Sequence, residues 1–153
     1  MEELRGGADV VLKKIMRQAA AERASDVHIE PGASFVRVRF RKDGLLSDRF
    51  CLSSSMAPNL SVRVKVLGRL DVGESRLPQD GSWAEEIDGV PYDFRISVLP
   101  SMYGETIVIR ILSGRVNFIE KNELGMRREQ ESLFRRALSK GQGLILTTGS
   151  GKT

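Results

Sequence analysis

The sequence predicts an α/β (α+β) fold, in which a mixed, mainly antiparallel sheet is flanked by helices and followed by the start of a second domain. Apolar and polar residues alternate with a period of two in several segments, which is typical of half-buried strands. Asp43-Gly44 and Asp88-Gly89 have the composition of tight hairpin turns. Other segments repeat apolar residues at helical spacing. At 153 residues, the chain can hold one domain and a piece of another.

The first predicted helix begins at Ala8. Its apolar residues form one stripe at helical spacing, namely Ala8, Val11, Leu12, Ile15 and Ala19. The basic residues Lys13, Lys14 and Arg17 lie off that stripe. They could bind acidic lipid or nucleic acid, but the pattern favours an amphipathic helix that packs on a sheet and leaves its basic face in solvent.

A short half-buried strand follows this helix and ends at Pro31-Gly32. His28, the single histidine of the chain, shares one face of the strand with Asp26 and Glu30. These three side chains could be metal ligands. However, side chains on one face of one strand splay apart, whereas a closed zinc site needs ligands that converge from separate elements. We therefore expect a hydrogen-bonded structural histidine.

Residues 35–41 form a clean alternating strand, which the Asp43-Gly44 turn joins to a partner strand at residues 45–52. Three arginines occupy its polar face, namely Arg37, Arg39 and Arg41. Two interpretations remain open. The arginines could bind an anion or an acidic partner, or they could form a solvent face that pairs with Asp48 and neighbouring acids.

A second helix is predicted after Ser53-Ser54-Ser55, because serine hydroxyls cap helix N-termini well. Its expected buried stripe consists of Leu60, Val64 and Leu67. Its basic residues, off that stripe, are Arg63, Lys65 and Arg69.

The segment from Leu70 to Asp80 is predicted to be a loop, because its proline and the Asp80-Gly81 pair mark a turn. No packing reason explains the many specific polar groups between Glu74 and Gly81. This loop is therefore a candidate for a functional site.

Three strands are predicted in close succession, at residues 82–87, 90–99 and 106–112. The last is apolar on both faces except for Arg110, which predicts a central strand that is covered on both sides. An unpaired buried charge is prohibitive, so Arg110 must find an anion or carbonyl groups. Structural pairing, for example with Asp93, and contact with a ligand both remain open.

The last forty residues read as a linker at 113–125, an amphipathic helix at 127–140, and an apolar strand that leads into the glycine-rich turn of residues 143–153. The expected core face of the helix is Leu133, Phe134, Ala137 and Leu138. Glycines allow backbone N–H groups to surround phosphate oxygens. In such a turn Lys152 would reach the β- and γ-phosphates, and the Thr153 hydroxyl would ligate Mg²⁺.

The composition limits the classes of protein that need to be considered. No long apolar run or signal peptide is present, so we expect neither a membrane span nor secretion. The single cysteine, Cys51, excludes an intramolecular disulfide and fits a cytoplasmic setting. A net charge of +4 suggests an acidic partner. Nucleic acid is not expected, since few aromatic residues besides Trp83 could stack on bases.

Seven segments together resemble the type II secretion and type IV pilus assembly ATPase family (the secretion ATPase E family), up to its Walker A motif. They are residues 24–31, 37–44, 63–67, 76–81, 93–97, 104–110, and 143–146 leading to 149–153. They occur in the family's order across almost all of residues 8–153. Seven segments in order are far more specific than any one of them.

The resemblance implies that residues 1–113 form the family's small PAS-like domain, and that residues 114–153 are a linker and the truncated start of a RecA-like, nucleotide-binding P-loop domain. In the family the motor is a hexamer on the cytoplasmic face of the inner membrane. It uses ATP and Mg²⁺ to move a pilus or pseudopilus through membrane platform proteins. The small domain transmits motion and supplies arginines to the nucleotide phosphates.

Carried over by position, the implied phosphate-binding turn is Gly149, Ser150, Gly151, Lys152 and Thr153, with Thr153 as the Mg²⁺ ligand. The implied arginines are Arg76, Arg95 and Arg110, of which Arg95 is the first choice for contact with nucleotide. Arginine suits this role because its planar, permanently charged guanidinium can stabilise phosphoryl charge.

The sequence departs from the family pattern in two places. Leu146 stands five residues before Gly151, where a full P-loop has glycine, so the motif looks three residues short. Ser82 stands where the family often has arginine. The family's catalytic acids and zinc-binding cysteines are also missing. We therefore expect this chain alone to bind no nucleotide and to have no ATPase activity, with no complete catalytic set.

A protein of a different class is the alternative to an ATPase fragment. The chain could be a free-standing interaction module that docks a secretion-platform protein without nucleotide. It would then use its basic strand and helix faces.

Overall fold

The computed structural model describes residues 2–3, 6–113, 125–146 and 148. The strands are β1 (Glu2–Glu3), β2 (Asp26–Pro31), β3 (Phe35–Lys42), β4 (Leu45–Ser53), β5 (Gln79–Ile87), β6 (Val90–Ser101) and β7 (Gly104–Ser113). The helices are α1 (Ala8–Ala21), α2 (Met56–Gly68) and α3 (Arg128–Leu138). The chain divides into two compact units, Met1–Arg115 and Val116–Thr153.

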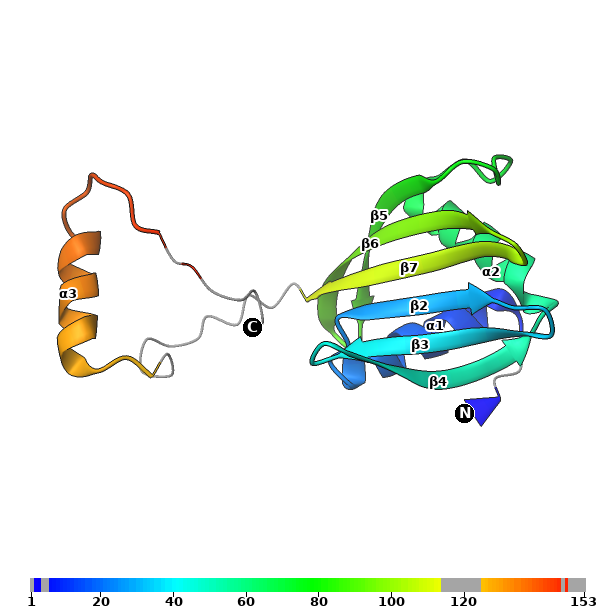
Figure 1. The fold of residues 1–153 in the computed structure, drawn as a ribbon, viewed down its shortest axis with the longest axis horizontal. Helices are drawn as coiled ribbons and strands as arrows, with labels where there is room; N and C mark the ends of the chain where they lie inside the picture. The colour runs from blue at the N-terminus through cyan, green and yellow to red at the C-terminus, as the bar shows by residue number, and fades with distance from the viewer. Residues whose placement is uncertain (1, 4–5, 114–124, 147, 149–153) are drawn as a thin grey trace. The chain divides into compact units, whose positions relative to one another are not determined.

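The first unit is one sheet with the strand order β1-β4-β3-β2-β7-β6-β5. The short β1 runs parallel to β4, and every other neighbouring pair of strands is antiparallel. Helices α1 and α2 lie on the same side of this sheet (Figure 1). The predicted mixed, mainly antiparallel sheet with flanking helices is thus confirmed. We call the side away from α1 and α2 the open face; it carries Asp26, Arg39, Arg95, Ser97 and Arg110.

Both predicted Asp-Gly hairpins are confirmed. Asp43 and Gly44 have φ values of 50° and 79°, and Asp88 and Gly89 have values of 51° and 77°. Positive φ at both central residues is the geometry of a type I′ turn, whose twist matches that of the strands it joins. These turns set the registers of β3 with β4 and of β5 with β6.

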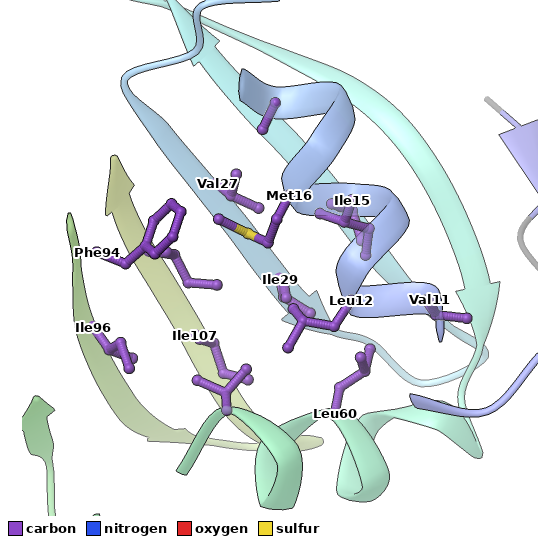
Figure 2. Packing of buried hydrophobic residues seen from close by; sticks show 14 of the residues in the cluster. Val11, Leu12, Ile15, Met16, Val27, Ile29, Leu60, Phe94, Ile96 and Ile107 are labelled. Carbon is purple, nitrogen blue, oxygen red and sulfur yellow. The ribbon is translucent and has the colours of Figure 1, made fainter. Parts of the chain in front are cut away.

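The core fills the space between the helices and the sheet (Figure 2). Val11, Leu12, Ile15 and Met16 of α1 point toward the apolar side of the strands. Their buried partners on the sheet and α2 include Val27, Ile29, Val38, Phe40, Leu60, Phe94, Ile96 and Ile107. The predicted stripe of α1 is correct in its main residues, because the period of 3.6 puts positions 11, 12, 15 and 19 on one side.

The buried side of α2 differs from the prediction. Ser61, Lys65 and Gly68 are buried together with Leu60 and Val64, whereas the predicted Leu67 is only partly buried. The buried side of α2 is therefore shifted by about one residue relative to the predicted stripe. As a result Lys65, which was predicted to lie off the stripe, is inside the protein. The cap also differs, since Ser55 lies at the N-cap but makes no capping hydrogen bond.

The loop before β5 is shorter than predicted. Gln79, Asp80 and Gly81 pair with Val98, Ser97 and Ile96 of β6, so the Asp80-Gly81 dipeptide is in a strand and not in a turn. Gly81 is needed there for another reason. A Cβ atom at this position would lie 2.7 Å from both the Gly68 carbonyl oxygen and Leu70 Cδ2. The glycine permits the end of α2 to approach the strand closely.

Strand β7 is central but is covered on one side only. Ile107 and Ile109 are buried against the helices, while the Arg110 side chain on the open face is 67% exposed. The prediction of cover on both sides was wrong, because the alternation of β7 is masked by Val108 and Leu112 on its open face.

The second unit contains α3 in its described part. The helix begins one residue later and ends two residues earlier than predicted, and the Arg127 N–H donates to Gln130 Oε1 at 3.0 Å. No residue described in this unit is buried. The predicted strand leading into the glycine turn is not formed at residues 144–146. None of the helices described here is both long and apolar enough to cross a bilayer.

Candidate functional site

Arg95 and Arg110 lie directly opposite each other on the open face. Alternation along β6 sends Phe94 and Ile96 into the core and Arg95 outward, and the register pairs Arg95 with Arg110 of β7. Both residues were predicted from the sequence as phosphate-binding arginines, but nothing in the sequence indicated that they are neighbours. Two like charges in opposed positions of a sheet repel each other. This arrangement therefore needs anions nearby.

Asp26 of β2 supplies one of these anions. Its carboxylate is 8% exposed, and its Oδ1 accepts a hydrogen bond from Arg110 Nε at 3.0 Å. Its Oδ2 accepts one from Ser25 Oγ at 2.8 Å and lies 3.6 Å from Arg41 Nε. Of the two interpretations of Arg110, structural pairing is thus observed, with Asp26 instead of the suggested Asp93. The sequence suggested Asp26 only as a possible metal ligand beside His28 and Glu30, and not as the partner of Arg110.

Arg95 is not compensated in this way. It makes no hydrogen bond or ion pair with any residue that the structure describes. Ser82, its partner in the register with β5, is a small residue that leaves space beside it. The guanidinium of Arg95 therefore presents a free positive charge next to a guanidinium that has been partly neutralised.

The two arginines line a shallow cavity of about 510 Å³ on the open face. The remaining lining residues are Asp26, Asp80, Gly81, Ser82, Ile96, Ser97 and Val108. Ser97 Oγ donates to an Asp80 carboxylate oxygen, so this acid is already engaged by a hydroxyl. The cavity therefore holds two carboxylates and two guanidinium groups, and the guanidinium of Arg95, which no described carboxylate engages, is the group suited to binding phosphate or carboxylate.

Arg76, the third predicted arginine, lies elsewhere. It is in the loop at residues 69–78 between α2 and β5 and does not line the cavity. Its side chain is 87% exposed and lies 3.5 Å from Glu74 Oε2, and its backbone N–H donates to Glu74 Oε1 at 2.5 Å. The structure thus brings two of the three arginines together and leaves Arg76 on a separate surface.

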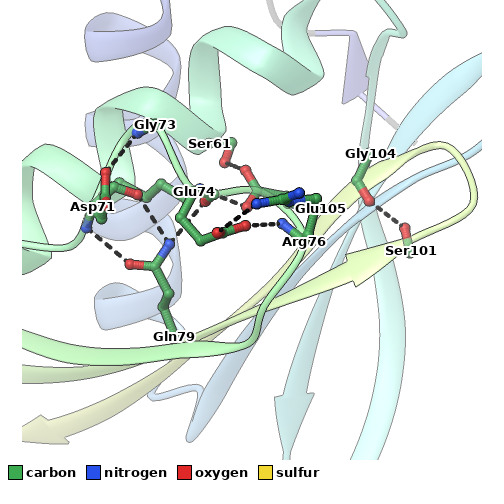
Figure 3. A network of polar contacts seen from close by, with 10 residues as sticks. Ser61, Asp71, Gly73, Glu74, Arg76, Gln79, Ser101, Gly104 and Glu105 are labelled. Atoms are coloured by element: carbon green, nitrogen blue, oxygen red, sulfur yellow. Dashed lines mark hydrogen bonds and ion pairs between the residues drawn. The ribbon is translucent and has the colours of Figure 1, made fainter.

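A polar network behind this loop was not found from the sequence (Figure 3). Lys65 of α2 is 1% exposed, and its Nζ lies 2.5 Å from Glu105 Oε1 and donates to the Glu74 carbonyl oxygen at 2.6 Å. Ser61 Oγ donates to the other oxygen of Glu105. Ser61 and Lys65 are four residues apart, which places them on one side of a helix, and this spacing was the available signal.

His28 differs from the hydrogen-bonded histidine that was expected. Its Nε2 is buried and has no hydrogen-bond partner among the described residues, and its Nδ1 lies 4.0 Å from Glu30 Oε1. The reason is that Arg39 Nη2 donates to Glu30 and engages that carboxylate. Burial lowers the pKa of His28, and the nearby Arg41 lowers it further. No group of three His, Cys, Asp or Glu side chains suited to a metal occurs in the described ranges.

The three arginines of β3 have individual contacts. Arg39 pairs with Glu30 and Arg41 with Asp26, so their acidic partners come from β2 and not from Asp48. Arg37 lies over the Phe35 ring, with 5.8 Å between its guanidinium carbon and the ring centre. The interpretation as a paired solvent face is therefore observed for two of the three.

The predicted phosphate-binding turn lies outside the described residues. It comprises Gly149, Ser150, Gly151, Lys152 and the implied Mg²⁺ ligand Thr153.

Comparison with known proteins adds an independent observation. A family model described as "Type II/IV secretion system protein" matches residues 5–153. The "Protein transport protein HofB homolog" of Escherichia coli (strain K12) is 42% identical over 146 residues, which cover 94% of this chain and 32% of that protein. The "Type II secretion system ATPase E" of Vibrio cholerae is 37% identical over 146 residues, covering 94% and 29%.

The "Type IV pilus assembly ATPase PilB" of Acinetobacter baylyi is 38% identical over 158 residues, covering 99% of this chain and 27% of that protein. The chain thus spans about a third of the length of the curated relatives that it matches.

Proposed function

Because the chain belongs to the type II/IV secretion system protein family, we propose that it is part of an ATPase that powers type II secretion or type IV pilus assembly. In this proposal residues 1–113 are the small PAS-like domain, and residues 114–153 link it to the start of a RecA-like motor. The observation that carries the proposal is Arg95, an arginine without a partner among the described residues, in a polar cavity beside Arg110.

The ligand proposed for Arg95 and Arg110 is the phosphate chain of ATP, and the family resemblance extends this proposal to Arg76 on its separate loop. The residues fit such a group, because Arg95 makes no ion pair with a described carboxylate and Ser82 adds a hydroxyl group to the same cavity. A planar guanidinium can donate two parallel hydrogen bonds to phosphate oxygens. Arg95 would bind the phosphates, and Asp26 would hold Arg110 in a fixed orientation beside it.

The remaining parts of the proposal follow from the family. Gly149, Ser150, Gly151 and Lys152 would surround the phosphates, and Thr153 would hold Mg²⁺ together with the nucleotide. Bound Mg-ATP would supply the β–γ phosphoanhydride bond, whose hydrolysis releases free energy. We further propose that the whole protein is a hexamer, acts at the cytoplasmic side of the inner membrane, and contacts a secretion or pilus platform protein there.

The proposal is tested by substituting Arg95 in the whole protein and measuring ATP hydrolysis and Mg-ATP affinity. We expect Arg95→Ala to lower kcat by about 10³-fold, the lower end for an arginine that meets phosphoryl charge. The kcat of Arg95→Lys should lie between those of the wild-type protein and Arg95→Ala, since lysine keeps the positive charge but lacks the planar guanidinium that donates two parallel hydrogen bonds. Arg37→Ala is the matched control, because Arg37 is also an open-face arginine and its one side-chain contact among the described residues is with the Phe35 ring. Equal activity of Arg95→Ala and Arg37→Ala would refute the role of Arg95.

An interaction module that docks a platform protein without nucleotide is the second candidate. The observation in its favour is that all the buried apolar residues described here lie between Val11 and Ile109, so the first unit has a complete core of its own. A fragment of residues 1–115 should then fold and bind the platform protein with an affinity that ATP does not change. Loss of this binding without the second unit would count against the module.

A further inference from the structure

Beyond Leu70, which packs against the core, the loop at residues 69–78 is ordered by polar contacts. It has no helix or strand of its own, and Val72, Leu77 and most of its other side chains are exposed. Gln79 is one of the residues that hold it. The Gln79 Nε2 donates to the carbonyl oxygens of Asp71 and Glu74, both at 2.9 Å, and its Oε1 accepts from the Asp71 N–H at 2.8 Å.

Lys65 of α2 also holds the loop. Its Nζ donates to the Glu74 carbonyl oxygen at 2.6 Å, the same oxygen that Gln79 contacts. Its charge is balanced by Glu105, which lies 2.5 Å away and also accepts from Ser61 Oγ. An ammonium group is costly to bury unless it is paired, and an apolar residue would fill the same helix position at no such cost. An apolar residue could not donate a hydrogen bond to the Glu74 carbonyl oxygen, as Lys65 does.

The contacts form a continuous connection between the arginines. Glu105 is in β7, the strand that also carries Arg110. Lys65 joins Glu105 to the backbone of Glu74, and the Glu74 carboxylate accepts from the Arg76 N–H at 2.5 Å. The loop that presents Arg76 is thus fixed to the strand that presents Arg110, although the two arginines lie on separate surfaces.

We propose that Lys65 is a positioning residue, which fixes the loop at 69–78 to β7 so that Arg76 is held in place for a phosphate-bearing ligand. This inference rests on the proposed function. Lys65 does not touch the ligand; it acts through the Glu74 carbonyl group and the backbone that leads to Arg76. Its loss should release the loop and leave the sheet intact.

The first test measures amide hydrogen exchange in the 153-residue chain with Lys65→Met, which keeps the volume and removes both polar contacts. Exchange at residues 71–77 should rise by about 10-fold or more, while β2 and β3 keep their rates. Lys13→Met is the matched control, since Lys13 is a 58% exposed helix lysine paired with Asp9, and it should change neither. Unchanged exchange in the loop, or an equal rise in all strands, would overturn the inference.

Gln79→Ala keeps the test decisive if Lys65→Met fails to fold. This substitution removes the hydrogen bond from Gln79 Nε2 to the Glu74 carbonyl oxygen without leaving a buried charge unpaired. Amide exchange in the loop should again rise relative to the wild-type protein, while the strands keep their rates. A loop that keeps its protection in this variant as well would show that these contacts do not order it.

The second test measures Mg-ATP affinity in the whole protein for Lys65→Met, Arg76→Ala and the double variant. We expect Lys65→Met to weaken binding by the same factor as Arg76→Ala, and the double variant to bind no more weakly than Arg76→Ala. A loss with Arg76→Ala but not with Lys65→Met overturns the positioning role. No loss with Arg76→Ala overturns the positioning role as well, because Arg76 then meets no phosphate; the proposed function is judged separately, on Arg95→Ala.

Discussion

The two units of the chain differ in where their apolar residues find partners. In Met1–Arg115, Phe40, Phe94 and twenty other apolar residues are buried against one another. In the described part of Val116–Thr153, Leu133 remains 63% exposed and Leu144 80% exposed. The sequence shows the same helical pattern in α1 and α3, so the pattern alone does not distinguish a helix that has a sheet to pack on from one that does not.

The difference indicates which unit can be stable alone. Helices of about 11 residues are marginal in water without tertiary packing. The apolar side of α3 therefore needs a surface that the described part of its own unit does not provide. In the proposed function, that surface belongs to the rest of the motor domain.

The largest expected effect comes from the cores. Phe40 is fully buried and packs edge-on against Phe50, with ring centres 5.9 Å apart. Phe40→Ala should lower the free energy of unfolding of the chain by about 3–5 kcal/mol, because it leaves a cavity. Leu133→Ala in α3 should change it by less than about 0.5 kcal/mol. Urea unfolding followed by far-UV circular dichroism measures both, and the fluorescence of Trp83 reports on the first unit alone.

Ile109→Val keeps this comparison measurable if Phe40→Ala does not fold. Its expected cost is about 0.5–1.5 kcal/mol. A cost for Leu133→Ala as large as that of Ile109→Val would mean that α3 is packed in solution, and the contrast between the two units would disappear.

A smaller effect is expected from glycines. At Gly81 a methyl group would lie 2.7 Å from the Gly68 carbonyl oxygen, so Gly81→Ala should destabilise the first unit by about 1–3 kcal/mol. Gly141 has a φ of 68° and nothing within 4 Å of an added Cβ. Gly141→Ala should strain the end of α3 and leave the main thermal transition unchanged. Equal shifts in Tm for the two variants would contradict this assignment.

The smallest effect is the pH dependence of stability that comes from histidine. It is confined to the first unit, since His28 in β2 is the single histidine of the chain. Burial lowers its pKa in the folded state, so the unfolded chain binds its proton more readily. The free energy of unfolding is therefore unaffected by protonation of His28 above the unfolded pKa of about 6.5. It decreases as the pH falls through and below that value, because the unfolded chain then binds the proton more readily. Chemical unfolding at pH 7.5 and 5.5 should show a smaller decrease for His28→Gln. An identical decrease in both proteins would exclude His28 as the cause.

Local chemistry made much of the fold predictable. Two Asp-Gly pairs fixed two hairpins, because few other dipeptides adopt positive φ twice. Alternation placed Phe94 and Arg95 on opposite faces of β6 without knowledge of the neighbouring strands. These signals are contained in a few adjacent residues and do not depend on the rest of the chain.

Contacts between distant segments were not predictable in this way. The prediction placed Lys65 among the basic residues of α2 off its buried stripe, because its partners, Glu105 and the Glu74 carbonyl group, are set by tertiary packing. Asp26 was considered only with its strand neighbours, whereas its partner Arg110 is 84 residues away. Gly81 was assigned to a turn, because the approach of α2 to β5 leaves no trace in adjacent residues.

The strand order has a consequence for how the molecule is assembled. Strands β2, β3 and β4 form one meander and β5, β6 and β7 another, and in the sheet the two meanders pair where β2 lies beside β7. Each meander needs short loops, but their junction must close most of the length of the first unit, which is the slower kind of contact to form. Asp26 and Arg110 meet at that junction. The charge arrangement around Arg95 is therefore completed in the same event that completes the sheet, and a half-folded chain would display neither.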